Sequence, residues 1–293
     1  MKIVKVIGGL GNQMFQFALY KVLQQQFPNE RILLDLHCFN GYKKHYGFEI
    51  TRIFHAGYEE AKLLEIARLA YPYPNFQTWR IGSRLLPVRR TMLKEKANLS
   101  IEKHLLDDTG DKYYDGYWQH EDYFINQREL ILKTFRFPDF TDERDLNLAQ
   151  QAANCNSVAI HVRRGDYITD KLFKDICTID YYTDAIHEVY SRTTPDLFLI
   201  FSNDISWCKQ NLSAHIKHPI IYVDWHRDYE NYRDMQLMTY CQHHIIANSS
   251  FSWWGAWLHQ GSQQIVICPE KWMNINHLVS PASPTWIKIS SNP

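Results

Sequence analysis

Several features are scarce in this sequence of 293 residues, and each scarcity argues against a class of protein. No apolar run approaches the roughly 18 residues that a membrane-spanning helix needs. The six cysteines are scattered without a Cys-x-x-Cys pair, which argues against a disulfide framework or a cysteine-based metal site and favours a reducing cytoplasm. Neither sign of charge is in excess, because 32 basic residues balance 32 acidic ones. Nothing therefore marks the chain as a partner of nucleic acid.

The content of the sequence predicts a folded α/β protein of two domains. Hydrophobic residues make up 45% of the chain, which is enough to bury a sizeable core, and the length suggests about two domains. The first residues, Met1–Ile7, are interrupted by Lys5 and run into glycines, which is typical of a first strand rather than a signal peptide. We place the domains at residues 1–150 and 151–293, with the boundary in the polar stretch 139–156.

The first domain opens with a β-turn-α unit whose turn is rich in glycine. Glycines before a helix let backbone amides approach an anion, so the turn invites a dinucleotide interpretation. The pattern is incomplete, because Met14 stands where a third glycine is usual. Asp35 can nevertheless mimic the acid that binds a ribose, and an NAD-dependent oxidoreductase is therefore one alternative. The expected elements are strand Lys2–Ile7, turn Gly8–Gly11, helix Asn12–Phe27 and strand Arg31–Asp35.

The rest of the first domain contains a basic segment. Between Arg80 and Lys96 six basic residues stand against the single acid Glu95. Two interpretations stay open: a solvated helical face, and a patch that contacts anionic lipid or a lipid-pyrophosphate acceptor. The other expected features are a long loop at Cys38–Ala56, a second loop at Tyr71–Arg90, helix Glu59–Ala70, strand Tyr113–Trp118 and helix Glu121–Phe135.

In the second domain, strands alternate regularly with helices. This alternation predicts right-handed crossovers and a parallel sheet. The expected strands are Ser157–Val162, Leu197–Ser202, Ile220–Val223, His244–Ala247 and Gln264–Cys268. The expected helices are Tyr181–Arg192, Ile205–Asn211, Tyr229–Gln242 and Phe251–His259.

The most informative stretch is His161–Tyr167, which follows the first strand of this domain. In open α/β sheets ligands bind beyond the carboxyl ends of the strands, where Arg163 and Arg164 are expected. Guanidinium groups stay charged and offer forked donors that match phosphate oxygens. The two arginines therefore predict a phosphate site that needs no metal. The alternative is a pair of surface arginines bonded to neighbouring carboxylates.

Polar residues follow two further strands of the same domain. Backbone amides where a helix begins near Ser250, with the Ser250 hydroxyl, would complement Arg163 around a diphosphate. Asp234 lies on the helix that leads into the expected strand His244–Ala247, which precedes Ser250. A carboxylate accepts the two parallel N–H bonds that guanine offers and adenine does not. If Asp234 faces the cleft, the nucleotide is guanine; the alternative is a helix acid that pairs with Arg233 or another neighbour. The two polar segments are Ser202–Asp204 and Asn248–Phe251.

The combination of motifs resembles the α-1,2-fucosyltransferases of glycosyltransferase family 11. The motifs occur in family order and span most of the chain, and the His-x-Arg pair and Gly-Asn-Gln turn also look like those of α-1,6- and protein O-fucosyltransferases. The resemblance implies a GT-B architecture, in which two facing Rossmann-like domains with parallel sheets enclose a cleft. It further implies an inverting transfer of L-fucose from GDP-fucose to O2 of a terminal galactose. The matching stretches are Gly8–Gln16, Gly116–Gln119, His161–Tyr167, Phe201–Asp204 and Asn248–Trp254.

The same resemblance assigns roles to individual residues. Arg163 would contact the donor phosphate, His161 and Asp234 the nucleoside, and Ser250 the pyrophosphate. Arg164 would support the loop by pairing with Asp166, although Asp166 is also a candidate general base. Asn12 would orient the acceptor or a bridging water. The further donor-site residues are Asn203, Asp204, Ser249 and Phe251, and those of the acceptor side are Gly11 and Gln13.

The chemistry implied by the family makes further expectations concrete. Metal-dependent glycosyltransferases commonly use an Asp-x-Asp pair, and none occurs in this sequence. We therefore expect no metal cofactor, with Arg163 and the helix start near Ser250 stabilising GDP as it leaves. The acceptor would be a galactose-terminated oligosaccharide, free or lipid-linked, and the protein cytoplasmic, with peripheral contact at the inner face of the membrane as an option. A binding module for nucleotide sugars or glycans, without turnover, is the alternative from another class.

Overall fold

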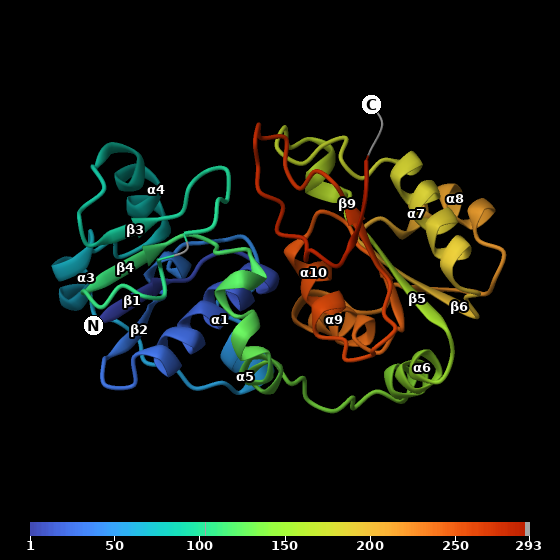
Figure 1. The fold of residues 1–293 in the computed structure, drawn as a ribbon, viewed down its shortest axis with the longest axis horizontal. Helices are drawn as coiled ribbons and strands as arrows, with labels where there is room; N and C mark the ends of the chain where they lie inside the picture. Colours follow the sequence, from blue (N-terminus) through green and yellow to red (C-terminus); the bar gives the residue numbers. More distant parts are fainter. Residues whose placement is uncertain (103, 291–293) are drawn as a thin grey trace. The chain divides into compact units, whose positions relative to one another are not determined.

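The computed structural model describes residues 1–102 and 104–290 and contains two compact units (Figure 1). They comprise Met1–Pro138 and Asp139–Pro293. The division falls at the start of the polar stretch 139–156 and before residue 150, because helix α6 (Glu143–Ala153) belongs to the second unit.

The N-terminal unit is built on a four-stranded parallel sheet with the order β2-β1-β4-β3. One face packs against α3, where Ile3 and Tyr113 of the sheet meet Ile66 of the helix in a buried cluster. The chain runs from β1 outward to β2 and later returns to the other side of β1, so the direction of winding reverses beside β1. The strands are β1 Lys2–Lys5, β2 Ile32–Asp35, β3 Met92–Lys94 and β4 Lys112–Asp115. The α-helices are α1 Leu10–Gln26, α2 Ile50–Phe54, α3 Leu63–Leu69, α4 Phe76–Leu85 and α5 Arg128–Thr134.

The C-terminal unit is built on a six-stranded parallel sheet with the order β10-β9-β8-β5-β6-β7. The chain winds outward from β5 through β6 to β7, then crosses to β8 on the other side of β5 and continues outward. This is the doubly wound order of a Rossmann fold, and its switch point lies between β5 and β8. The strands are β5 Ser157–Val162, β6 Leu197–Ser202, β7 Ile220–Val223, β8 His243–Ile245, β9 Val266–Pro269 and β10 Ile287–Ile289.

The two faces of this sheet carry different helices, as the period of two along a strand requires. Val158 and Ile160 of β5 pack in one cluster with residues of α7 and α8. Ala159, between them, packs in another with residues of α6 and α9. Figure 1 shows β5 and β6 between these helices. The helices that follow α6 are α7 Ile179–Arg192, α8 Ile205–Asn211, α9 Tyr232–Met238 and α10 Ser250–Trp257.

The expected strands and helices of the second half are present, although several differ in their bounds from the prediction. The helix expected at Tyr229–Gln242 is confined to α9 after a 3-10 turn at Asp228–Glu230. The strand expected at His244–Ala247 is β8, which ends at Ile245 because Ala247 already belongs to the turn that leads into α10. Strand β10 was not anticipated from the sequence.

Three predictions for the first half were wrong in detail. The helix expected at Glu121–Phe135 is interrupted at Phe124, whose non-helical φ of −146° separates two 3-10 turns that precede α5. The loop expected at Cys38–Ala56 contains α2, and the loop expected at Tyr71–Arg90 contains α4. The stretch 139–156 contains α6, which the Asp142 carboxylate caps by accepting a 2.8 Å hydrogen bond from the Arg144 amide.

Candidate functional site

Polar side chains gather at the switch point of the C-terminal sheet. Arg163 and Arg164 follow β5, and the start of α10 follows β8, its neighbour in the sheet. Because all strands are parallel, their carboxyl ends lie at one edge. We call this group the C-terminal cluster; its members are His161, Arg163, Arg164, Asp166, Asn203, Asp204, Ser249, Ser250 and Phe251.

Asp166 pairs with Arg163. The expected pairing of Asp166 with Arg164 was wrong. The Nε and Nη2 atoms of Arg163 lie 3.0 and 2.8 Å from Asp166 Oδ1. The short 3-10 turn Gly165–Ile168 brings the two side chains to the same side. A guanidinium carries five N–H donors, so further donors of Arg163 remain available to an anion. The pair is accessible, since 33% of the Arg163 side chain and 64% of the Asp166 side chain are exposed.

Arg164 is tied to the end of β6. Its backbone amide donates to Asn203 Oδ1 at 3.0 Å, and its Nε donates to Asp204 Oδ2 at 3.2 Å. The guanidinium also lies 4.2 Å from the centre of the Trp207 ring. Asp204 in turn caps α8 by accepting from the Trp207 amide. These contacts hold the loop after β5 against α8, which gives Arg164, Asn203 and Asp204 a structural role.

His161 is buried at the end of β5 with one ring nitrogen unused. Its Nδ1 has no hydrogen-bond partner among the residues that the structure describes. Burial, with the nearby Arg163 guanidinium, lowers the pKa of His161 to about 3, so the ring is neutral at neutral pH. The ring also packs against Phe251, with 5.7 Å between centroids. A buried polar atom without a partner calls for an explanation, and binding of a polar ligand atom would supply one.

The start of α10 is organised by Ser249. The Ser249 hydroxyl caps the helix by accepting a 3.3 Å bond from the Phe251 amide, and Ser250 is the first helical residue. Behind them, Asn248 is buried and donates from its side chain to the Trp272 carbonyl at 3.1 Å. The Tyr167 hydroxyl donates to the Asn248 carbonyl at 3.4 Å, which connects this turn to the loop after β5. The helix start therefore has a fixed position beside the arginine loop.

Asp234 belongs to a chain of three side chains that the sequence did not reveal. Its Oδ1 lies 2.7 Å from His226 Nδ1, and His226 Nε2 lies 2.9 Å from Asp145 Oδ2. Arg233 pairs with Glu230. Asp234 therefore pairs with another side chain, as the alternative allowed, but its partner is His226 and not Arg233. Burial raises the pKa of Asp234, although His226 opposes the shift.

The imidazole at the centre of this chain has a raised pKa. Burial alone would lower the pKa of His226, but the hydrogen bonds to Asp234 and Asp145 outweigh it. Asp145 comes from α6, His226 from the loop after β7 and Asp234 from α9, far apart in the sequence. In the sequence, only the residue types, a histidine and two acids, pointed to this group. The three residues are too far apart along the chain to form a recognisable motif.

The N-terminal unit has its own polar group where the winding of its sheet reverses. Gly8, after β1, has φ +100°, and an added Cβ would lie 2.8 Å from Asn12 Nδ2. The Asn12 Oδ1 accepts a 2.7 Å bond from Gln119, which follows β4. Gln16 of α1 donates to the Gly116 carbonyl at 2.9 Å. The motifs Gly8–Gln16 and Gly116–Gln119 are thus joined at one edge of the sheet.

Two residues of this unit are engaged inside the fold. Gln13 is fully buried: its amide nitrogen donates to the Gly8 and Gly47 carbonyls, and its oxygen accepts from the Glu49 amide. It therefore fastens the 47–49 loop to the glycine turn rather than facing a ligand. The neighbouring Gly11 is also buried. Asp35, the ribose-binding candidate, accepts from the Tyr113 hydroxyl at 2.6 Å and from the His37 amide at 3.0 Å. These contacts weaken the NAD interpretation.

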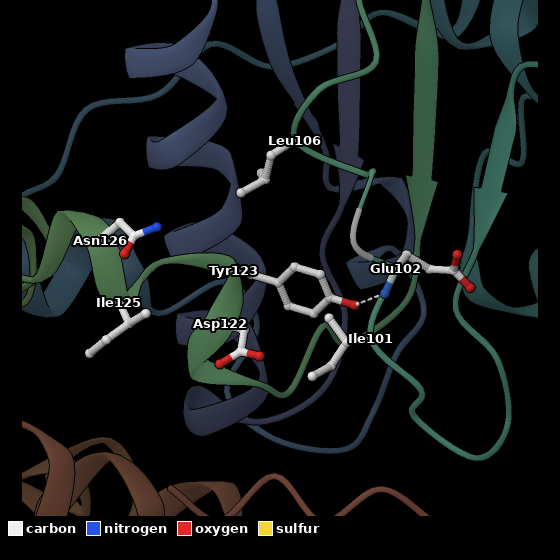
Figure 2. A pocket seen from close by; sticks show the side chains of 7 residues that line it. All are labelled: Ile101, Glu102, Leu106, Asp122, Tyr123, Ile125 and Asn126. Carbon is white, nitrogen blue, oxygen red and sulfur yellow. Dashed lines mark hydrogen bonds between the residues drawn. The ribbon is translucent and has the colours of Figure 1, made fainter. Parts of the chain in front are cut away.

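A surface cavity of about 390 Å³ lies elsewhere in the N-terminal unit (Figure 2). Its lining is mixed, with a tyrosine ring, three aliphatic side chains, two carboxylates and an amide, and it includes no residue predicted for the site. The Tyr123 hydroxyl accepts from the Glu102 amide at 3.0 Å, so that wall is fixed. The lining residues are Ile101, Glu102, Leu106, Asp122, Tyr123, Ile125 and Asn126.

Two searches of the described residues returned nothing. Across 1–102 and 104–290, no three His, Cys, Asp or Glu side chains come together in a way that could hold a metal ion. In the same part of the chain, no helix combines the length and apolar character needed to cross a bilayer.

Comparison with known proteins decides the family. The model of glycosyl transferase family 11 matches residues 89–290, more than half of the chain. The chain belongs to glycosyltransferase family 11. An Escherichia coli protein named alpha-1,2-colitosyltransferase is 30% identical over an alignment of 298 positions, which covers 98% of this chain and 98% of the relative. The O-antigen biosynthesis glycosyltransferase WbnK of Escherichia coli is 31% identical, over 96% of this chain and 98% of the relative.

More distant family members match only part of the chain. The galactoside alpha-(1,2)-fucosyltransferase 1 of Leontopithecus chrysomelas is 29% identical over 149 residues, which cover 47% of this chain and 40% of the relative. Together these relatives confirm the resemblance to family 11 and the assignment as a glycosyltransferase.

The fold agrees with those of solved fucosyltransferases. The alpha-1,6-fucosyltransferase NodZ, in a crystal soaked with GDP-fucose, aligns over 88% of this chain and 91% of its own with a TM-score of 0.52 and 15% identity. Another NodZ structure, from Bradyrhizobium, has a TM-score of 0.51 and 14% identity over 87% of this chain and 91% of its own. With two parallel-sheet α/β units, the chain has a GT-B-like fold, as the resemblance to family 11 implied.

Proposed function

We propose that this glycosyltransferase transfers L-fucose from GDP-fucose to O2 of a terminal galactose, with inversion at the sugar carbon. The acceptor class is a galactose-terminated oligosaccharide, free or lipid-linked. The observation that carries the proposal is the C-terminal cluster, where a fixed guanidinium and a capped helix start share the switch point of a Rossmann-like sheet. That is the chemistry that a nucleoside diphosphate leaving group requires.

In the proposed mechanism, Arg163 stabilises the departing GDP. The galactose hydroxyl oxygen forms a bond to C1 of fucose while the bond from C1 to the phosphate oxygen breaks. The electron pair of the broken bond leaves with GDP, and the hydroxyl proton passes to water. Negative charge therefore grows on the diphosphate, and donors that meet it there lower the barrier. Arg163 supplies charge from one side and the backbone amides at the start of α10, with Ser250, supply donors from another.

Asp166 orients Arg163 in this proposal. It contacts the guanidinium through two of the five N–H groups and leaves the rest for phosphate oxygens. We therefore assign it a positioning role and do not assign it the proton of the acceptor hydroxyl. The Asn12–Gln119 pair in the N-terminal unit is proposed to orient the acceptor, because an amide is a poor base but binds a hydroxyl well.

The nucleoside is proposed to be guanosine, recognised by His161 and Asp234. The neutral imidazole of His161 has an unused Nδ1, and its tautomer adapts to a donor or an acceptor. The bond from His226 engages Asp234 Oδ1 and limits the rotation of the carboxylate. Such preorganisation favours a base that presents two parallel N–H groups.

The decisive experiment measures GDP release from GDP-fucose with and without a β-galactoside. Release that depends on the galactoside, with α-1,2-fucosyl galactoside as product, supports the proposal. Binding of GDP-fucose without any release in the presence of galactosides would favour a binding module. A colitosyl donor belongs in the same assay, because the Escherichia coli relative that matches nearly the whole chain is named a colitosyltransferase. Turnover with that donor alone would refute the fucose assignment.

A further inference from the structure

Helix α4 and the segment that follows it form an exposed apolar surface on the N-terminal unit. No residue of α4 is buried. The exposed fractions are 58% for Ile81, 76% for Leu85, 44% for Leu86 and 55% for Val88. Ile81 and Leu85 are four residues apart and therefore share a face of the helix. Contiguous exposed apolar side chains of this kind usually mark an interaction surface.

The segment is firmly held, so the exposure is not that of a loose loop. At its start, Asn75 caps α4 by accepting a 3.0 Å bond from the Thr78 amide. On its inner side, the Trp79 ring lies 4.3 Å from the Lys5 ammonium. At its end, Arg89 donates to the carbonyls of Ala67 and Ala70 at 2.9 and 2.6 Å. One face of α4 is thus held against the rest of the unit, and the other face is exposed to solvent.

Three arginines border the apolar residues. Arg80 and Arg84 lie on α4, one helical turn apart, and Arg90 follows Val88; all three are exposed. None of them forms an ion pair with another residue in the part of the chain that the structure describes. The single acid between residues 76 and 96 is Glu95, and its carboxylate accepts from the Tyr117 and Trp118 amides. The surface therefore keeps its positive charge.

We propose that this surface, formed by Arg80, Ile81, Arg84, Leu85, Leu86, Val88 and Arg90, docks on an anionic lipid bilayer. Arginines beside exposed aliphatic side chains suit the headgroup region, where the guanidinium groups meet lipid phosphates and the apolar groups enter the acyl boundary. A second copy of the chain is a poorer occupant, because a twofold contact would bring the same arginines together. Figure 1 shows α4 at the periphery of its unit, well separated from α1 and α5.

The proposal is independent of the donor and acceptor, and vesicle sedimentation tests it. The full-length protein is mixed with vesicles of phosphatidylcholine alone or phosphatidylcholine with phosphatidylglycerol. We expect binding to the anionic vesicles only, with release at high salt because screening weakens the phosphate contacts. The affinity of the variant Arg80→Gln/Arg84→Gln/Arg90→Gln for the anionic vesicles should fall about fivefold per arginine, or on the order of a hundredfold in all. The variant Ile81→Ser/Leu85→Ser should also bind more weakly.

Matched controls separate docking from net charge and from misfolding. A triple replacement of exposed cations elsewhere changes the net charge equally, and a double replacement of exposed leucines matches the apolar change. Both controls should bind like the wild type. Equal binding to neutral and anionic vesicles, no release by salt, or an equal loss in the charge control would overturn the proposal. The controls are Arg136→Gln/Lys217→Gln/Lys271→Gln and Leu146→Ser/Leu172→Ser.

Discussion

Replacing Arg163 by alanine tests the proposed stabilisation of the leaving group. Deleting one donor that meets developing negative charge typically costs about 2.7–4 kcal/mol, or roughly a hundredfold to a thousandfold in kcat. The free energy of unfolding should change little, because the Arg163–Asp166 pair is partly exposed and such pairs contribute at most about 1 kcal/mol. We therefore expect a large fall in kcat with a melting temperature close to that of the wild type.

The assay follows GDP release from GDP-fucose at saturating galactoside, beside a thermal melt of each variant. Asp166→Asn is the matched comparison: if this side chain only positions Arg163, the variant keeps the shape of the wild-type pH–rate profile with a smaller loss. Arg164→Ala should behave differently and lose stability, because its guanidinium contacts Asp204 and Trp207. A near-normal turnover number in Arg163→Ala would refute the mechanism.

Three further predictions concern metal dependence, the glycine turn and His226. Activity should survive EDTA, and complete loss that manganese restores would contradict the proposed role of Arg163. Gly8→Ala should lower the free energy of unfolding by about 2 kcal/mol, measured by urea titration, because φ is +100° and the new Cβ would crowd Asn12. The raised pKa of His226 stabilises the fold fully below its unfolded value, near pH 6.5, and the contribution is lost as the pH rises through the folded pKa. His226→Gln should therefore be less stable than the wild type near pH 6, and its stability should decline less steeply above that pH. An unchanged pH profile of stability would mean that the pairing of His226 with Asp145 and Asp234 has no energetic role.

The central strands of the C-terminal unit, β5 and β6, were predictable because they are nearly continuous apolar runs. Ser157–Val162 is buried along its whole length, as expected of a strand covered on both faces. Parallel strands bring their carboxyl ends to one edge, so the sequence placed Arg163 and Ser250 at the same edge of the sheet. The pairing of β8 with β5, which makes the two strand ends neighbours, came only from the structure. Helix α6 was missed because its buried face consists largely of the small residues Ala149 and Ala152 within a polar sequence.

The pairing of individual side chains was much less predictable. Arg163 and Arg164 are adjacent, and only the 3-10 turn after them decides which one Asp166 meets. Gln13, at the start of α1, looked like a residue facing a ligand, but loop 47–49 folds over it and takes its hydrogen bonds. His226 gains its importance from Asp145, which is 81 residues away in the sequence. Such contacts depend on tertiary structure, which no local pattern encodes.

The most direct test of the account is a crystal structure of the protein with GDP-fucose bound. Both the arginine loop and the glycine turn present groups suited to phosphate, but they belong to different units. We predict diphosphate oxygens within hydrogen-bonding distance of the Arg163 guanidinium and of the amide and hydroxyl of Ser250. A diphosphate held instead by the turn at Gly8–Gly11 would contradict the central claim.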